Sequence, residues 1–199
     1  MTEKIAKRVS LYLVGAGIAQ EKDRLMLEYG LFHTLSSFLH ILYLFLVGFW
    51  FSVLLEIAVF SLFFCSLKGQ IGGAHATGHW QCLLTFTGAA LGGALLGKTL
   101  SPLPCSLAIM LFLSGASFVL VFLRAPTVHP NNPVHKKAAL AKFRKKAVLT
   151  SGIQFVCAAC LSFFASLSPY LICGSLGSAA AAVTLLLPIP NPNGKEGET

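Results

Sequence analysis

Long apolar runs, separated by short polar segments, are the feature of this sequence that most limits how the chain folds. A helix needs about 20 apolar residues to cross the hydrocarbon core of a bilayer, which is about 30 Å thick. Apolar residues make up 55% of the chain and charged residues only 11%, whereas soluble domains carry roughly 25% charged residues. The alternating strands of a transmembrane β-barrel are not visible. The sequence therefore predicts an all-α, polytopic transmembrane helical bundle.

The apolar runs predict about six transmembrane helices. They cover approximately residues 31–51, 53–67, 82–97, 105–123, 147–167 and 170–187. Residues 1–28 place apolar and basic side chains at helical spacing on opposite faces, which predicts an amphipathic helix lying on an anionic membrane surface. Residues 188–199 are rich in proline and glycine, so they are expected to form a disordered tail. The whole chain is expected to be one membrane-embedded domain.

The basic residues predict how the chain is oriented in the membrane. Fourteen of the fifteen lysines and arginines lie in the N-terminal region, in two loops on one side, or in the tail, and only Lys98 falls in an expected outer loop. Because basic residues concentrate on the cytoplasmic side, both termini are expected in the cytoplasm. The net charge of +8 is thus interpreted as a topology signal. No aromatic-interleaved nucleic-acid motif accompanies it, so no nucleic-acid partner is expected.

The cysteines are interpreted in the main as structural residues. Apolar runs contain, inside them or at their ends, Cys65, Cys82, Cys157, Cys160 and Cys173, which favours small buried hydrophobic side chains over a disulfide scaffold for most of them. Cys157 and Cys160 form a CxxC pair, but no second pair and no histidine lies near them in the sequence. A redox or zinc role is therefore not favoured for this pair.

A polar segment between the second and third expected spans contains the residues best suited to chemistry. It reads KGQIGGAHATGHWQC and begins at Lys68, with His75 and His79 close in sequence to the thiol of Cys82. A cysteine attacks as the thiolate, and at a reference pKa of about 8.5 little thiolate is present at neutral pH. A histidine base removes the thiol proton and returns it to the leaving amine of an acyl transfer. The segment therefore predicts a Cys-His nucleophilic pair.

Other interpretations of this segment stay open on spacing alone. His75 and His79 could be interfacial polar residues, with Cys82 simply the start of a helix. Together the three could also hold a zinc ion, which needs three protein ligands in a catalytic site, although no carboxylate second shell is visible nearby. We expect no metal and no cofactor.

The spacing also raises the question of which histidine is the base. On one straight helix His75 and Cys82 would lie about 10 Å apart along the axis, too far for a hydrogen bond. His79 would be the nearer neighbour. We expect a loop or kink at residues 77–79, permitted by Gly78, that brings His75 to the sulfur and leaves His79 a lesser, substrate-facing role.

Three further ionisable residues fall inside apolar runs. His33 and His40 stand seven residues apart without a matching thiol and are interpreted as buried or interfacial. Glu56 is an acid in an expected span, which is either functional or an interfacial carboxylate. An alternative function follows from these residues, namely a non-enzymatic transporter or export component for a peptide or metal ion. The inverted repeats of many transporters are missing.

The pattern GGAHA, with a cysteine seven residues after the histidine and two apolar spans before it, resembles the accessory-gene-regulator B (AgrB) family of bacterial membrane peptidases. Three more features agree with this resemblance. They are the basic amphipathic N-terminus, Glu28-Tyr29-Gly30 before the first span, and Ala125-Pro126 with Asn132-Pro133-Val134 in the second basic loop. The resemblance extends over nearly the whole chain, and its His…Cys segment is the specific part.

The resemblance implies a membrane cysteine endopeptidase of the bacterial cell membrane. Such an enzyme removes the C-terminal tail of a small AgrD-like precursor peptide through a thioester, and the product is a cyclic thiolactone or lactone for quorum sensing. It implies Cys82 as the nucleophile and His75 as its helper. Candidate supporting residues are His79, Gly72, Gly73 and Lys68. The other expected partners are membrane lipids, and a homodimer is left open.

Two positions depart from the family pattern. Lys68 stands where an arginine is common, and Thr127-Val128-His129 replaces a more acidic stretch after the Ala-Pro pair. The second departure concerns the identity of the peptide substrate rather than the reaction.

Overall fold

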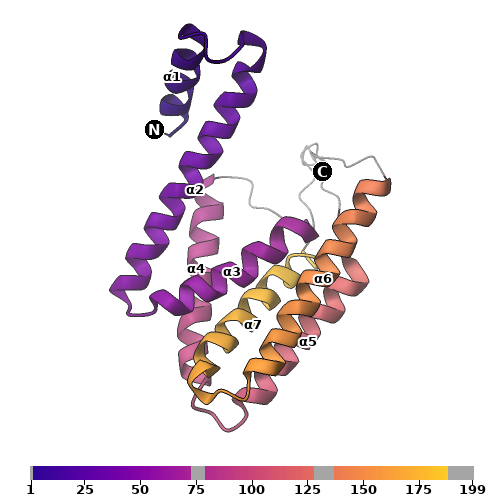
Figure 1. The fold of residues 1–199 in the computed structure, drawn as a ribbon. Helices are drawn as coiled ribbons and strands as arrows, with labels where there is room; N and C mark the ends of the chain where they lie inside the picture. Colours follow the sequence, from indigo (N-terminus) through magenta and orange to yellow (C-terminus); the bar gives the residue numbers. More distant parts are fainter. Residues whose placement is uncertain (1, 73–78, 128–136, 188–199) are drawn as a thin grey trace, which may run out of the picture. The chain divides into compact units, whose positions relative to one another are not determined.

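The computed structural model describes residues 2–72, 79–127 and 137–187, and these residues form seven α-helices (Figure 1). The helices are α1 (Thr2–Gly15), α2 (Arg24–Trp50), α3 (Leu54–Ile71), α4 (His79–Leu100), α5 (Ser106–Arg124), α6 (Lys137–Leu161) and α7 (Ser168–Val183). Two short 3-10 helices, Glu21–Asp23 and Ala165–Leu167, precede α2 and α7. In this part of the chain no strand occurs, so the all-α prediction is confirmed.

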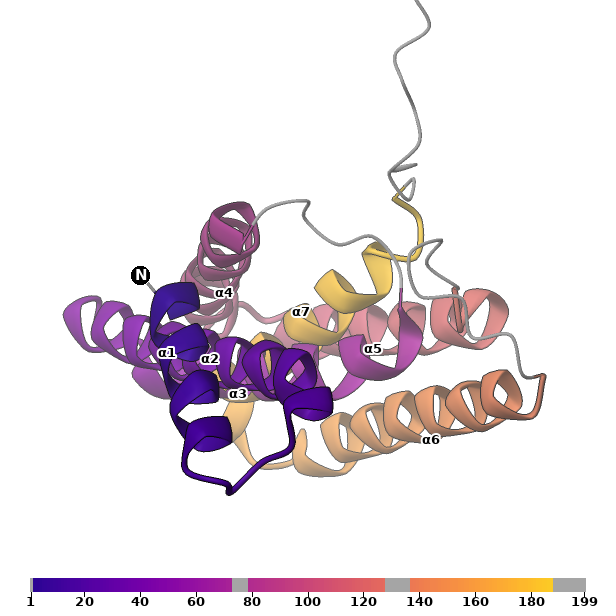
Figure 2. The ribbon, with the colours of Figure 1, turned by 90° about the horizontal axis from the view of Figure 1, so that it is seen from above.

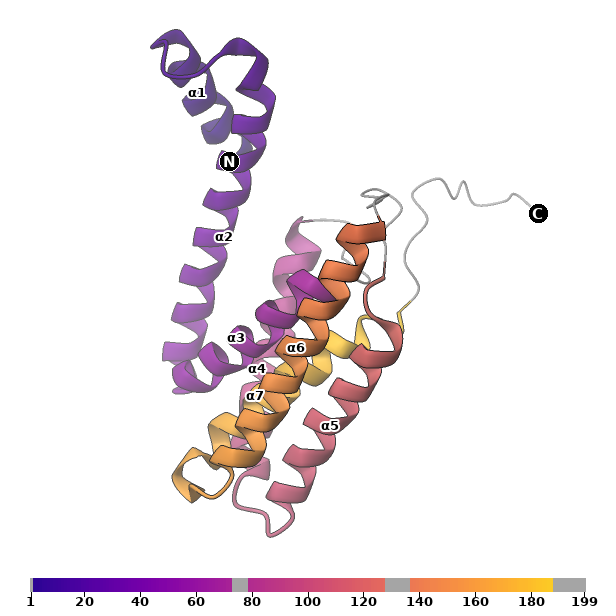
Figure 3. The same ribbon diagram turned by 45° about the vertical axis from the view of Figure 1, so that its right-hand side comes forward.

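The chain divides into two compact units, residues 1–47 and 48–199. In the N-terminal unit α1 folds back beside the first turns of α2 (Figure 3). The two helices are joined by a turn in which Gly17 has a φ of 70°, a conformation that glycine adopts without a steric penalty. A shallow apolar groove of about 330 Å³ runs between them, lined by Ile5, Ala6, Val9, Leu31, Thr34, Leu35 and Phe38. The expected N-terminal helix is present as α1, but it ends at Gly15, and residues 24–28 already belong to α2. Its position on a membrane surface stays a prediction.

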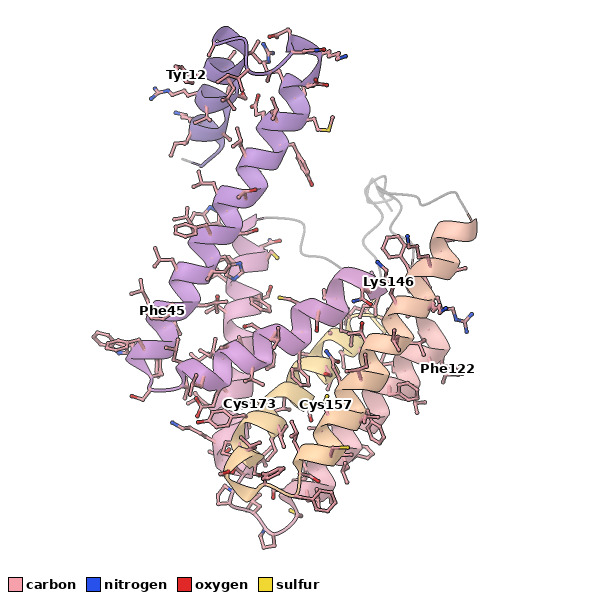
Figure 4. The ribbon with its side chains drawn as sticks, in the orientation of Figure 1. Tyr12, Phe45, Phe122, Lys146, Cys157 and Cys173 are labelled. Atoms are coloured by element: carbon pink, nitrogen blue, oxygen red, sulfur yellow. The ribbon has the colours of Figure 1, made fainter. Side chains whose placement is uncertain are left out.

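In the described part of the chain, four helices are long and apolar enough to cross a membrane, and they match the first four expected spans in order. They are Glu21–Trp50, Leu54–Ile71, Trp80–Leu100 and Ser106–Arg124. Large apolar side chains cover the outer surfaces of these helices, for example Phe45, which is 52% exposed, and Phe122, which is 51% exposed (Figure 4). Soluble monomers rarely expose extensive apolar patches. The chain is a membrane protein.

The last two expected spans differ from the helices observed. α6 begins at Lys137, ten residues before the expected start at 147, because alanine, leucine, lysine and arginine are all good helix formers and nothing here stops the helix. Its first turns are therefore strongly basic. α7 has 16 residues, fewer than the roughly 20 that span a bilayer. By length and composition these two helices are not among the four candidate spans, and six spans stay a prediction.

α7 is the central helix of the second unit and packs against α3, α4, α5 and α6 (Figure 2). Its small residues permit this, because close helix approach requires small side chains at the contact. A Cβ added at Gly177 would collide with the Phe60 backbone, and one added at Gly174 would press on the Phe63 ring. On α4, close helix contact occurs at only some of the glycines. Gly93 and Gly97 make close contacts, whereas a Cβ at Gly88 or Gly92 would meet nothing within 4 Å.

We predict that Gly177→Ala lowers the melting temperature of the detergent-solubilised protein. The added methyl group has no space beside the Phe60 backbone, and overpacking of this kind costs about 1–3 kcal/mol. Gly92→Ala is the matched control, because its methyl group enters open space and alanine favours a helix over glycine by about 1 kcal/mol. Equal melting temperatures for the two variants would contradict the packing described here.

Candidate functional site

Cys82 lies in the first turn of α4 and its side chain is exposed. The turn that holds it is reinforced by Thr85, whose hydroxyl donates to the carbonyl oxygens of Gln81 at 2.6 Å and of Cys82 at 3.2 Å. A nucleophile must be within reach of its substrate, and a fully buried thiol would not be. The position of Cys82 at a helix start, open to the surroundings, meets that requirement.

Two side chains of α3 lie close enough to Cys82 to interact with it electrostatically, and these are Cys65 and Lys68. Both belong to the C-terminal half of α3, whose last residue is Ile71. The end of α3 and the start of α4 therefore bring a second thiol and a cation into the surroundings of Cys82. Lys68 is one of the supporting residues that the sequence suggested.

Lys68 is half-buried and is held by two acceptors from different parts of the chain. Its Nζ donates to the Gly72 carbonyl oxygen at 2.8 Å and to Thr184 Oγ1, also at 2.8 Å. Thr184 follows the last residue of α7, Val183. The lysine thus ties the C-terminal end of α3 to the C-terminal end of α7, and Figure 1 shows these ends side by side.

Gly72 ends α3 in a conformation that favours glycine, with φ 70° and ψ −132°. A Cβ at this position would collide with the carbonyl oxygen of Thr127. The Thr127 backbone N–H donates to the Ile71 carbonyl oxygen at 3.0 Å, and Gly72 and Thr127 form an isolated parallel bridge. The residues just after α5 therefore pack directly on the first residue of the glycine-rich segment.

Several of the predicted site residues cannot be placed. Gly73 and His75 lie outside the described residues, as do residues 74 and 76–78. His79 is the first residue of α4, and its side chain is likewise outside the description. The predicted approach of His75 to Cys82, and the predicted kink between them, stay predictions. In the described part of the chain no three His, Cys, Asp or Glu residues are grouped for a metal, but this does not test a set that contains His75.

Glu56 is paired at the opposite end of α3. Its carboxylate, 9% exposed, lies 3.8 Å from Lys98 Nζ, and the same ammonium group donates to the Ser52 carbonyl oxygen at 2.7 Å. Twelve residues separate Glu56 from Lys68, about 18 Å along a helix. Glu56 therefore belongs to a contact between α3 and α4 that is remote from Cys82.

The interpretation of the cysteines as buried residues is wrong for most of them. Cys173 is buried, whereas Cys65, Cys82, Cys157 and Cys160 are exposed; Figure 4 shows Cys157 and Cys173 on neighbouring helices. The physical reason is that lipid is as apolar as a protein core. An apolar run therefore does not reveal which face of a helix turns inward.

Thr184 was not identified from the sequence, and Thr127 was assigned no structural role. Thr184 lies 116 residues from Lys68, and it falls inside the sixth expected span, residues 170–187. No spacing rule connects the two positions. Thr127 drew notice only as a departure from the family pattern, and its contact with Gly72 depends on where α5 ends.

The fold and the site together define a helical membrane protein with an exposed cysteine near a lysine, where α3 ends and α4 begins. The chain belongs to the accessory gene regulator B family, whose model matches residues 2–185. That match covers all seven described helices almost completely. No curated protein and no solved structure matches the chain. Membership of the family makes this a membrane protein of quorum-sensing peptide processing.

We predict that Gly72→Ala opens the contact between α3 and Thr127. A side chain at this φ costs about 1–2 kcal/mol and also meets the Thr127 carbonyl oxygen, so hydrogen exchange of the Thr127 amide should rise about tenfold. Gly69→Ala is the control, because a Cβ there meets nothing within 4 Å. Unchanged exchange at Thr127 in Gly72→Ala would show that glycine is not required.

Proposed function

We propose that this protein is a membrane cysteine endopeptidase that removes the C-terminal tail of a small AgrD-like precursor peptide. The observation that carries the proposal is Cys82, an exposed thiol at the start of α4 with the Lys68 cation nearby. Membership of a family that acts in quorum-sensing peptide processing supports it. All 199 residues would act as one membrane-embedded peptidase domain.

In the proposed reaction the Cys82 sulfur attacks the carbonyl carbon of the scissile peptide bond. His75 accepts the thiol proton and then donates it to the leaving amine, so that the peptide bond breaks and the tail departs with a free N-terminus. The remaining peptide is held as a thioester on Cys82. Lys68 supplies positive charge close to the atoms on which negative charge develops, and such preplaced charge lowers the barrier of acyl transfer.

The thioester then reacts with a cysteine or serine side chain of the peptide itself. Attack by that side chain breaks the thioester, releases Cys82 as the thiol once it regains a proton, and closes a thiolactone or lactone ring. No external energy source is needed for this exchange, because a thioester is itself an activated acyl group. The cyclic product would be the quorum-sensing signal.

The proposed location is the bacterial cell membrane, crossed several times, with both termini and Cys82 on the cytoplasmic side. The distribution of basic residues supports this orientation, since the expected outer loops carry only Lys98. A cytoplasmic site would meet the precursor peptide where it is synthesised.

The transporter alternative depended on Glu56 and the histidines lining a path through the membrane. The Glu56 carboxylate is instead ion-paired with Lys98 and is buried between helices. This contact removes Glu56 as support for the transporter, which favours the peptidase.

We predict that Cys82→Ala abolishes release of the tail, by at least about 10³-fold, because a covalent nucleophile cannot be replaced by a methyl group. The measurement is mass spectrometry of an AgrD-like precursor peptide co-expressed with the full-length protein. Cys65→Ala and the double change Cys157→Ala with Cys160→Ala are controls that should retain cleavage. Full activity of Cys82→Ala would exclude covalent catalysis by this residue.

A second prediction tests the orientation with native cysteines. A membrane-impermeant maleimide applied to intact cells should label Cys105, which is exposed in the connection between α4 and α5. Cys82 should be labelled only after the membrane is permeabilised, because positive residues keep its side in the cytoplasm. Labelling is read residue by residue by mass spectrometry, and the reverse pattern would overturn the proposed orientation.

A further inference from the structure

We propose that Thr184 is a positioning residue of the Cys82 site. Its hydroxyl accepts a hydrogen bond from the Lys68 ammonium group, which also donates to the Gly72 carbonyl oxygen, and this arrangement fixes the end of α3 at Gly72. The effect of Thr184 on catalysis rests on the proposed function, whereas its effect on the end of α3 does not.

The Thr184 hydroxyl is oriented to accept a hydrogen bond from a cation. It donates its single proton to the Ala181 carbonyl oxygen at 2.7 Å, which leaves its lone pairs for other partners. Lys68 Nζ donates to Thr184 Oγ1 at 2.8 Å. A hydroxyl fixed in this way by its own helix is a preorganised acceptor, and it does not need to give up another bond in order to bind the lysine.

The residues around Thr184 are anchored in the core. Ala181, Ala182 and Leu185 are buried in one cluster with Leu67 and Ile71 of α3. Lys68 lies between those two α3 residues in the sequence and is only half-buried. The end of α7 is therefore packed against the stretch of α3 that carries Lys68. This packing holds the Thr184 hydroxyl beside the lysine.

Three chain segments meet at Gly72 as a result. From α3, Lys68 Nζ donates to the Gly72 carbonyl oxygen. From the end of α7, Thr184 accepts a hydrogen bond from the same lysine. From the residues after α5, Thr127 forms a bridge with Gly72. A cation is also favourable here because the carbonyl groups at a helix C-terminus carry partial negative charge. The position of Gly72 is thus fixed by the Lys68 contact on one side and by the Thr127 contact on the other.

This matters for the proposed chemistry because His75 follows Gly72 by only three residues. Three residues of chain span at most about 11 Å, so where Gly72 is held limits where His75 can reach. The same lysine interacts electrostatically with Cys82. Thr184 would therefore act on both members of the proposed pair through Lys68, without touching the peptide substrate.

The test compares three threonine variants of the full-length protein in proteoliposomes. Thr184→Val removes the hydroxyl and keeps the size and branching of the side chain, and Thr184→Ser restores the hydroxyl. Thr99→Val is the matched control, because the Thr99 hydroxyl also donates to a carbonyl three residues earlier, that of Leu96 at 2.9 Å. Thr99 lies 17 residues after Cys82 in α4, about 25 Å along the helix.

Two readouts are taken from each variant. Release of the tail from an AgrD-like precursor peptide gives kcat and KM, and hydrogen exchange of residues 69–72 without peptide reports on the end of α3. In Thr184→Val we expect kcat to fall about tenfold with KM changed less than about twofold, the size of effect that one bond to a charged group has. Exchange of residues 69–72 should rise while the melting temperature stays near that of Thr99→Val. Thr184→Ser and Thr99→Val should match the unaltered protein.

Unchanged kcat and unchanged exchange in Thr184→Val would overturn the proposal. A loss of kcat that Thr184→Ser does not rescue, or that follows a general fall in melting temperature, would also overturn it in favour of a purely structural role. If Thr184→Val does not insert, Thr184→Ala provides the same comparison. Faster exchange at 69–72 combined with full cleavage by Cys82→Ala would mean that the contact is real and the proposed peptidase function is wrong.

Discussion

The close packing of α7 against α3 is the constraint on which the second unit depends. It is possible only because Gly177 has no side chain where it meets the Phe60 backbone, and because Gly174 leaves space for the Phe63 ring. Between apolar helices in lipid, association relies on such close contact rather than on exclusion of water. With α7 seated in this way its C-terminal end is brought to the C-terminal end of α3, where Thr184 meets Lys68.

Polar side chains inside the bundle reinforce the same packing. Gln154 of α6 donates from Nε2 to the Phe63 carbonyl oxygen at 3.0 Å and to Ser66 Oγ at 2.9 Å, while its Oε1 accepts from Ser178 Oγ at 2.9 Å. One side chain thus joins α3, α6 and α7. Each of these groups would lack a partner if its helix turned toward lipid, and an unsatisfied polar group there is costly. Lys68 is held in a similar way, since its acceptors among the described residues, the Gly72 carbonyl oxygen and Thr184 Oγ1, lie at the ends of packed helices.

Much of the fold could be predicted, because a bilayer imposes simple rules on sequence. Residues 53–67 and 105–123 were recognised as spans from apolar length alone, and each lies, except for its first residue, within an observed helix, α3 or α5. The start of α6 at Lys137 was missed, since a charged loop and a charged helix end have the same composition. The exposure of Cys157 and Cys160 was missed because lipid and protein interior favour the same residues, so their helix could be recognised but not its inward face.

At the site, the sequence by itself determined the chemistry that is available, namely a thiol at Cys82, imidazoles at His75 and His79, and glycines between the helices. These residues are neighbours along the chain, so local spacing was enough to select them. Only the tertiary structure decided that Lys68 is held by Thr184 and that Gly72 pairs with Thr127. Those contacts join residues far apart in sequence, and they exist only because the packing of α7 and α5 brings the helix ends together, which no local pattern specifies.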